Sequence, residues 1–299
     1  MWRGSSGRQI VVACLSGGRE DKPMIQESHA AAQCDACHVF AGARMRHNRR
    51  MPQVQQNPLD LIEWVDEIDS TNSELLRRVA AGSARAPQVL VAARQSQGRG
   101  RAGRHWISPG PMQNAENLCL SMLIDVAVPV AELAPLTLAL GVAARRALPQ
   151  VQLKWPNDLF LAGKKLGGIL VEVAKSSAMS CTVVAGIGVN LRMSQSIEID
   201  QQYIDLASIG LPMSARELAP LMVAQFLAAA EDYEANRLTN FFSEWRDADA
   251  LAGRLVTVSD DPSTHWRGLG INARGGFLIG FDDQVRELVA GEIRVRLEN

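Results

Sequence analysis

The spacing of hydrophobic and polar positions changes at about residue 57. Residues 1–56 follow neither the 3.6-residue period of a helix nor the alternation of a strand, and they mix Gly, Ser, Arg, Gln and His. A segment of this composition buries too little apolar surface to fold alone, so we expect it to be a disordered extension. Met51 directly precedes the first regular pattern, which makes it a candidate for the true start of the protein.

Strand-like and helix-like patterns alternate from residue 57 to residue 249. Alternating or continuous apolar runs predict strands, whereas apolar positions three and four residues apart predict helices. The expected strands are 62–68, 88–95, 117–126 and 181–191, with a hairpin over 151–173 that turns at Ala162–Gly163. The expected helices are 70–82, 131–148, 214–236 and 238–250.

The start and the end of the first helix have their own signals. Thr71 and Glu74 have the spacing of a capping box, in which a hydroxyl and a carboxylate satisfy the free N–H groups of the first turn. Gly82 is a suitable stop, because glycine readily adopts the left-handed conformation that ends many helices. A helix between these residues accounts for Thr71 without any functional role.

Short strands separated by glycine turns follow Gly253. The expected strands are 254–259, 265–271, 275–281 and 292–297. We therefore divide the chain into the extension 1–56, a larger domain over 57–249 and a small all-β domain over 250–299.

Composition narrows the possible functions without choosing one. The chain has 299 residues, of which 47% are hydrophobic and 21% charged, with a net charge of −1. This composition fits a globular protein and gives no overall charge for binding polyanions. The apolar runs are shorter than the ~18 residues that a membrane helix needs. Without an export signal, we expect a cytoplasmic protein whose five cysteines are reduced.

One cysteine pattern suggests a cofactor that we do not expect. Cys34, Cys37 and His38 match the C-x-x-C-H motif of c-type haem attachment. Haem attachment takes place after export, and the sequence shows neither an export signal nor a clear second iron ligand. A chance match is the better interpretation.

The segment "GRGRAGRHW" (98–106) raises three hypotheses. Gly98, Gly100 and Gly103 fit the dinucleotide-binding fingerprint, but that fingerprint must open a helix, and the following "HWISPGP" (105–111) contains two prolines and a glycine. An RNA-binding arginine–glycine patch requires repetition, which is lacking. A flexible anion-binding loop fits better, because glycines allow close approach and arginines bind carboxylates and phosphates. Taken alone, however, the segment is better explained as a solvated surface loop.

Six motifs in a fixed order change that assessment. They are "STN" (70–72), Gln95, "GRGRAGRHW" (98–106), "KWPNDL" (154–159), "KLGGIL" (165–170) and "GIGVNL" (186–191). Together they resemble the biotin–protein ligases, from about residue 60 to the final "GEIRVRL" (291–297). Each motif is weak by itself, whereas their order and spacing are highly specific.

The resemblance implies a two-step reaction. These ligases join biotin to ATP, which gives biotinyl-5′-AMP and pyrophosphate, and then transfer biotin to a lysine of a biotin carboxyl carrier protein. Two anions must approach each other in the first step, so the site needs positive charge and little water. Mg²⁺ is expected to contribute further charge, bound mainly to phosphates with few protein ligands.

The resemblance also assigns residues to these roles. It implies that Ser70, Thr71, Asn72 and Gln95 hold the biotin head group, and that Arg99, Gly100 and Arg101 belong to a loop that closes over biotin and the adenylate. Lys154 is expected to contact the region of the biotinyl carboxylate and α-phosphate, and Asn190 to lie near the nucleotide. We count Lys154, Arg101 and Arg104 as catalytic, and Arg99, Arg101, Arg104 and Asn190 as adenylate-binding. Gly167 and Gly168 complete the biotin site, and we assign no metal ligand.

Simpler explanations exist for several of these residues. Lys154 lies in a segment where apolar and polar residues alternate, so it could simply be a polar residue on the solvent face of a strand. Gly167 and Gly168 could be ordinary strand glycines, although glycine weakens a strand and a closely approaching ligand would account for the pair. A non-catalytic biotin or nucleotide sensor, or a lipoate-type acyl ligase, is the alternative function.

The fold implied by the resemblance is α+β. It consists of a class II synthetase-like catalytic domain, with a mixed, mostly antiparallel sheet and helices, and a small C-terminal SH3-like β-barrel. We expect no membrane association and no DNA binding, since residues 1–56 show no helix-turn-helix pattern. A homodimer is compatible with the sequence, which does not decide the oligomeric state.

A first prediction concerns the N-terminal extension. A chain that begins at Met51 should retain its thermal stability and its ligase rate, because the composition of residues 1–50 does not support a packed core. Thermal unfolding and the rate of biotin transfer, measured for both lengths, test this. A loss of about tenfold in rate, or DNA binding that requires residues 1–50, would contradict this prediction, because an unfolded extension is expected to contribute to neither.

Overall fold

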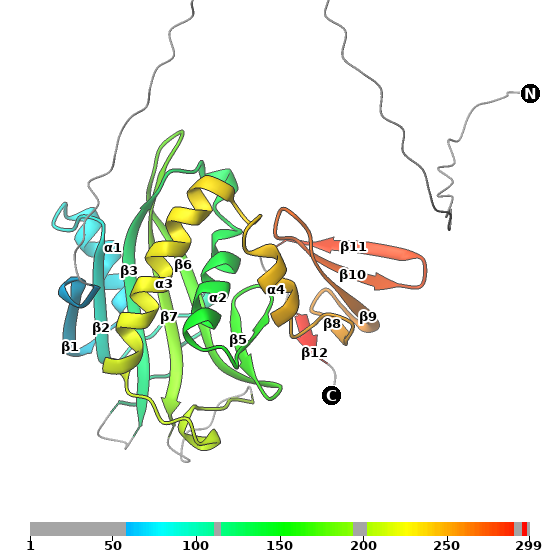
Figure 1. Ribbon diagram of the computed structural model, residues 1–299, viewed down its shortest axis with the longest axis horizontal. Helices are drawn as coiled ribbons and strands as arrows, with labels where there is room; N and C mark the ends of the chain where they lie inside the picture. The colour runs from blue at the N-terminus through cyan, green and yellow to red at the C-terminus, as the bar shows by residue number, and fades with distance from the viewer. Residues whose placement is uncertain (1–57, 111–114, 194–201, 290–294, 298–299) are drawn as a thin grey trace, which may run out of the picture. The chain divides into compact units, whose positions relative to one another are not determined.

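A seven-stranded mixed sheet forms the centre of the described structure (Figure 1). In this computed structural model, residues 58–110, 115–193, 202–289 and 295–297 are described. The extension 1–56 and its Cys34–His38 motif lie outside these residues. The expectation of disorder and the interpretation of the motif as a chance match therefore stay predictions.

The strands of this sheet are hydrogen-bonded in the order β1-β2-β3-β7-β6-β5-β4. They are β1 (Ile62–Ile68), β2 (Gln88–Gln95), β3 (Glu116–Val126), β4 (Gln152–Lys154), β5 (Asp158–Leu161), β6 (Lys164–Ser176) and β7 (Cys181–Arg192). β1 and β2 are parallel, and the other pairs are antiparallel. The predicted mixed, mostly antiparallel sheet is therefore confirmed.

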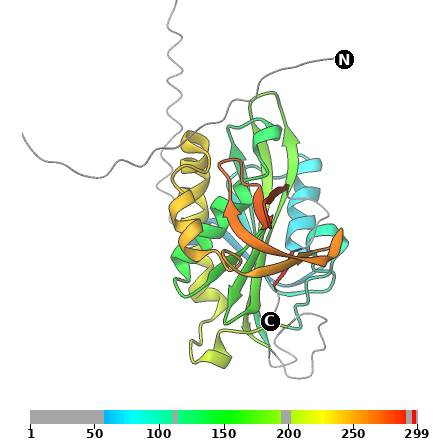
Figure 2. The ribbon, with the colours of Figure 1, turned by 90° about the vertical axis from the view of Figure 1, so that its right-hand side faces the viewer.

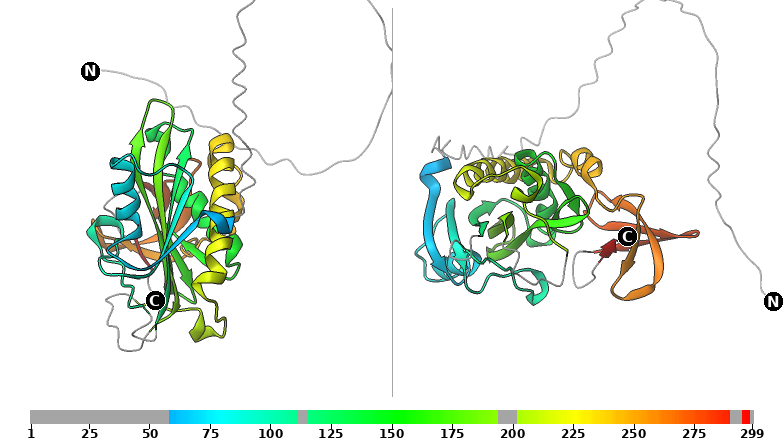
Figure 3. Two further views of the ribbon diagram at one scale, coloured as in Figure 1. Left: turned by 90° about the vertical axis from the view of Figure 1, so that its left-hand side faces the viewer. Right: turned by 90° about the horizontal axis from the view of Figure 1, so that it is seen from below.

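Helices cover both faces of the sheet (Figures 2 and 3). α2 (Leu136–Ala147) and α3 (Ala215–Asn236) lie on one face, and α1 (Thr71–Ala80) lies on the other. α4 (Phe242–Ala248) follows α3 and packs beside α2. Because both faces are covered, β3 and β7 are apolar along nearly their whole length rather than alternating.

The beginning of α1 corrects the sequence-based interpretation. Ser70, not Thr71, is the N-cap, and its hydroxyl accepts a hydrogen bond from the Ser73 backbone N–H over 3.4 Å. Glu74 forms ion pairs with Arg77 and Arg78 instead of closing a capping box on Thr71. Thr71 is therefore not explained by helix capping. The predicted stop is confirmed, since α1 ends at Ala80 and Gly82 has a φ of 72°.

Two other helices are shorter than their patterns predicted. Val130–Glu132 form a separate 3-10 turn, and Pro135 is the N-cap of α2, so α2 begins at Leu136 rather than at residue 131. α4 covers Phe242–Ala248 and not 238–250. The hairpin turn between β5 and β6 is where it was predicted, with Ala162 and Gly163 both at positive φ.

A second, five-stranded sheet follows α4. Its strands are β8 (Leu255–Val258), β9 (Asp261–Ile271), β10 (Phe277–Phe281), β11 (Gln284–Leu288) and β12 (Val295–Leu297), in the order β11-β10-β9-β8-β12. β11 was not predicted from the sequence. The described pairing leaves β11 and β12 at opposite ends of this order, so closure into an SH3-like barrel remains a prediction.

The two sheets share one hydrophobic core. Trp155, directly after β4, stacks on Phe277 of β10 with ring centroids 5.6 Å apart. Its indole N–H donates to the Gly275 carbonyl over 3.0 Å. Val256, Phe277 and Ile279 belong to the same buried cluster as the residues between the large sheet and α2 and α3.

No helix within the described ranges is long and apolar enough to span a membrane.

Candidate functional site

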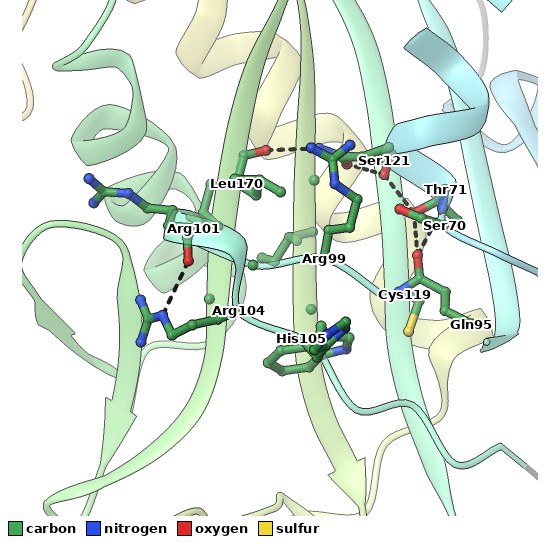
Figure 4. Close-up of a pocket in the computed structure, with 18 of the residues that line it drawn as sticks. Ser70, Thr71, Gln95, Arg99, Arg101, Arg104, His105, Cys119, Ser121 and Leu170 are labelled. Carbon is green, nitrogen blue, oxygen red and sulfur yellow. Dashed lines mark hydrogen bonds between the residues drawn. The ribbon is translucent and has the colours of Figure 1, made fainter. Parts of the chain in front are cut away.

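A cavity of about 420 Å³ opens on the large sheet, beside the start of α1 (Figure 4). This is within the size range of about 300–1,000 Å³ that is usual for small-molecule sites. Most of the residues assigned from the sequence line it: Ser70, Thr71, Asn72, Gln95, Arg99, Gly100, Arg101, Arg104, Gly168 and Asn190. Among the assigned residues, Lys154 and Gly167 do not line it.

One end of the cavity is a cluster of hydroxyl and amide groups. Gln95 Oε1 accepts hydrogen bonds from the Thr71 backbone N–H (2.8 Å) and the Thr71 hydroxyl (3.1 Å). The Ser121 hydroxyl of β3 lies 2.6 Å from Thr71 Oγ1 and donates to Asn72 Oδ1 over 2.5 Å. Ser70, Thr71 and Asn72 are almost fully buried. Buried polar groups with fixed partners are suited to recognising a ligand through directed hydrogen bonds.

The arginine–glycine loop forms a tight turn over the cavity. The Gly100 N–H donates to Arg104 O over 2.7 Å, and the Trp106 N–H donates to Gly98 O over 2.9 Å. Between them the chain turns through Ala102 and Gly103, both at positive φ. In the described residues 104–110 that follow this turn there is no α-helix, whereas the dinucleotide-binding fingerprint would open one.

The three arginines of the loop have different environments. Arg99 forms an ion pair with Glu172 of β6 over 2.5 Å and donates to the Ser73 hydroxyl over 3.1 Å. Arg104 donates from Nε to the Arg101 carbonyl over 3.2 Å. Figure 4 shows Arg101 and Arg104 on one side of the view, the Thr71–Gln95–Ser121 cluster on the other, and Arg99 between them.

Arg101 is a partly buried cation next to a second cation. Burial lowers the pKa of its guanidinium, and the nearby positive charge of Arg104 lowers that pKa further. Both causes disfavour the charged guanidinium, and the carboxylate of Asp158 acts in the opposite direction. An anion beside Arg101 would likewise offset the repulsion by Arg104, so these arginines favour a negatively charged ligand.

Lys165, not Lys154, is the lysine at the cavity wall. Lys165 begins the "KLGGIL" segment of β6 and forms an ion pair with the buried Asp158 over 2.7 Å. Lys154 of β4 lies with its ammonium group 4.8 Å from the centre of the Phe160 ring. The contact expected for Lys154 with a ligand is therefore not supported by its position. Lys165 was not among the residues assigned from the sequence, although it belongs to the "KLGGIL" motif.

Glycines let neighbouring side chains approach β7 from the cavity. A Cβ atom on Gly186 would lie 2.1 Å from Asn72 Oδ1, and one on Gly188 would lie 2.5 Å from the Trp106 indole. Glycine at position 167 has a different explanation, because a Cβ atom there would lie 2.3 Å from the backbone oxygen of Gly188. The ligand-based explanation of Gly167 is therefore replaced by strand packing, whereas Gly168 lines the cavity as expected.

Another part of the cavity wall is aromatic and weakly polar. Trp106 follows the loop and packs on Gly188, which makes a flat surface available beside Ile107. Cys119 of β3 donates from its thiol to the Ser108 hydroxyl over 3.2 Å. Burial raises the pKa of the Cys119 thiol above its usual range, so the wall is uncharged there at neutral pH.

Asn190 is held at the wall by two other segments. It accepts from Asn117 Nδ2 over 3.1 Å and donates to the Ile204 carbonyl over 3.1 Å. Among the described residues, no group of three or more His, Cys, Asp or Glu side chains is placed to hold a metal ion.

Comparisons with known proteins point in one direction. The model of the biotin/lipoate A/B protein ligase family matches residues 64–190. The bifunctional ligase/repressor BirA of Salmonella typhimurium is 34% identical over 237 residues, which are 77% of this chain and 72% of that protein. The biotin–[acetyl-CoA-carboxylase] ligase of Mycobacterium tuberculosis is 34% identical over 60% of this chain and 71% of its own length.

Solved structures give the same fold. The biotin protein ligase of Aquifex aeolicus, in complex with biotin and ATP, superimposes with a TM-score of 0.67 at 26% sequence identity. The match covers 79% of this chain and 99% of that chain.

Proposed function

Because the chain belongs to the biotin/lipoate A/B protein ligase family, we propose that it is a biotin–protein ligase that uses ATP. One observation carries this conclusion. The cavity has a cluster of fixed hydroxyl and amide groups at one end and cationic side chains at the other. The groups of biotin match these two ends, because biotin has a hydrogen-bonding ureido ring at one end and a carboxylate at the other.

The reaction consists of two displacements. In the first, a biotin carboxylate oxygen attacks the α-phosphorus of ATP, a new oxygen–phosphorus bond forms, and the bond to pyrophosphate breaks. In the second, a neutral lysine amine of the carrier attacks the acyl carbon, an amide forms, and AMP leaves with the bonding electrons. The amine proton is released to solvent.

The described side chains support a division of roles. Thr71, Asn72 and Gln95 bind the ureido ring through the hydrogen-bonded cluster that they already form. Arg101 and Lys165 supply positive charge where the carboxylate meets the α-phosphate, because both line the cavity. Preorganised charge of this kind stabilises a transition state in which negative charge accumulates. We therefore propose Lys165 for the role that sequence analysis gave to Lys154.

The remaining assignments are finer proposals. Arg104 and Asn190 contribute to the adenylate site, which they line. Mg²⁺ would accompany ATP and would add positive charge beside its phosphates, and we assign it no ligand among the described residues. The carrier is the biotin-accepting domain of a carboxylase, as the name of the Mycobacterium tuberculosis relative suggests.

Architecture and location complete the proposal. We propose 57–249 as the catalytic domain and 250–299 as an SH3-like domain, supported by the change from the mixed sheet to the five-stranded sheet. A cytoplasmic ligase that does not bind DNA is the corresponding cellular expectation, and a homodimer is compatible with it. Sedimentation with and without biotin tests the oligomeric state directly.

Pyrophosphate release tests the proposed activity. Biotin and ATP together should produce pyrophosphate and biotinyl-5′-AMP, whereas either substrate alone should not. Lipoate in place of biotin is the matched control for the family's other acyl substrate. Tight biotin binding without pyrophosphate would identify a sensor, and a preference for lipoate would identify a lipoate ligase; both results contradict the proposal.

A further inference from the structure

Glu172 of β6 joins two parts of the site that are far apart in the sequence. One carboxylate oxygen accepts a hydrogen bond from Arg99 of the loop over 2.5 Å, and the other accepts from Asn72 Nδ2 of α1 over 2.9 Å. The Glu172 side chain is only 20% exposed. It does not line the cavity itself, so any effect on a ligand must act through Arg99 and Asn72.

The contact with Asn72 determines which way the amide of this residue faces. An ionised carboxylate can only accept hydrogen bonds, so the amide nitrogen of Asn72 must point to Glu172. Leu170 O accepts from the same nitrogen over 3.3 Å, which favours the same orientation. Asn72 Oδ1 consequently faces the Ser121 hydroxyl, 2.5 Å away. Through Ser121, Glu172 thus sets the donor and acceptor pattern beside Thr71 and Gln95.

The contact with Arg99 holds the loop. Arg99 is paired by its backbone with His105 across the turn, and its guanidinium reaches both Glu172 and the Ser73 hydroxyl. The loop is thereby connected to α1 and β6 by one side chain. Because Glu172 balances the charge of Arg99, this arginine contributes less to attracting a phosphate than the sequence analysis assumed. Arg99 is better suited to holding the loop closed.

We propose that Glu172 is a positioning residue that couples recognition of the biotin head group to closure of the 98–106 loop. The proposal rests on the proposed function, since it concerns the same cavity. When Glu172 orients Asn72 for the ureido ring, it also retains Arg99, so the group that shapes the head-group site also keeps the adenylate enclosed.

Glu172→Gln separates this role from simple packing. Glutamine has nearly the same size, but it carries no charge for Arg99, and its amide can donate to Asn72 as well as accept from it. The KM for biotin should rise about tenfold, which corresponds to about 1.4 kcal/mol. The KM for ATP should change less than about threefold. Escape of free biotinyl-5′-AMP should increase about fivefold, a modest effect because one partner of the broken ion pair, Arg99, is well exposed.

Two further variants make the measurement specific. Glu244→Gln removes a carboxylate that pairs with Arg146 over the same 2.5 Å, between α4 and α2 and away from the cavity, and should behave as wild type. Arg99→Gln should increase adenylate escape as much as Glu172→Gln, with a smaller change in the KM for biotin. The double variant should show no additional escape, because both substitutions break the same contact.

The outcomes distinguish this inference from the proposed function. If wild-type protein forms the adenylate and Glu172→Gln matches Glu244→Gln in the KM for biotin and in escape, the positioning role is wrong and the ligase remains. Equal increases in both KM values, or fully additive escape in the double variant, would also overturn it. If wild-type protein forms no adenylate from biotin and ATP, the proposed function fails and the inference fails with it.

Discussion

Replacing Lys165 by alanine should slow the formation of biotinyl-5′-AMP by about 10²–10³-fold, since one contact directed at developing charge is typically worth about 2.7–4 kcal/mol. Lys165 lines the cavity and is the partner of the buried Asp158. Its removal takes away a positive charge and also leaves the Asp158 carboxylate without that cation. Both changes oppose the approach of a carboxylate to a phosphate.

Single-turnover formation of the adenylate is the appropriate measurement, because it excludes the transfer step. Lys175→Ala is the matched control, since Lys175 is an exposed lysine of the same strand. Lys154→Ala decides between the two assignments: the sequence-based one predicts the large loss for Lys154, and the geometry predicts it for Lys165. A rate for Lys165→Ala within about threefold of wild type would remove the proposed electrostatic role, which requires a far larger change.

Replacing Arg101 by alanine should release free biotinyl-5′-AMP about tenfold faster than wild type, because hydrogen bonds to charged groups contribute about 1.5–3 kcal/mol. Arg101 is largely buried in the loop, and its burial lowers the pKa of the guanidinium. An adenylate phosphate would offset the cost of that burial and hold the loop over the cavity. Without this cation, the loop loses its principal charged contact with the intermediate.

Hydrogen exchange in residues 98–104 provides a second measurement of the same role. In wild-type protein, exchange should slow when biotin and ATP are added, because the phosphate orders a loop whose glycines make ordering unfavourable. In Arg101→Ala this slowing should be absent. If exchange in the loop of the ligand-free wild-type protein is already slow, the loop is a rigid element and the closing mechanism is wrong.

Continuous apolar segments were the most predictable parts of the fold. β2 begins and ends where its sequence pattern does, and β3 and β7 are each only one residue longer, because these central strands are covered on both faces. β11 was missed because its sequence "QVREL" has charged and polar positions and buries only Leu288. An exposed strand at the end of a sheet has little apolar pattern to detect.

Local motifs were less reliable where distant residues decide the outcome. Thr71 and Glu74 have the capping-box spacing, yet the hydroxyl of Thr71 contacts Gln95, 24 residues away in the sequence. Lys164 and Lys165 are adjacent in β6, where successive side chains point to opposite faces, and of the two only Lys165 lines the cavity. The roles of Gly186 and Gly188 depend on Asn72 and Trp106, so no spacing rule could have identified them.

Transfer of labelled biotin to a carrier domain, with and without ATP, tests the central claim most directly. The account predicts ATP-dependent labelling of a single carrier lysine, accompanied by the formation of AMP. Labelling should disappear when ATP is omitted and should return when purified biotinyl-5′-AMP replaces biotin and ATP. A carrier that remains unlabelled with biotin and ATP, or that is labelled equally well without any nucleotide, would contradict the assignment of this chain as a biotin–protein ligase.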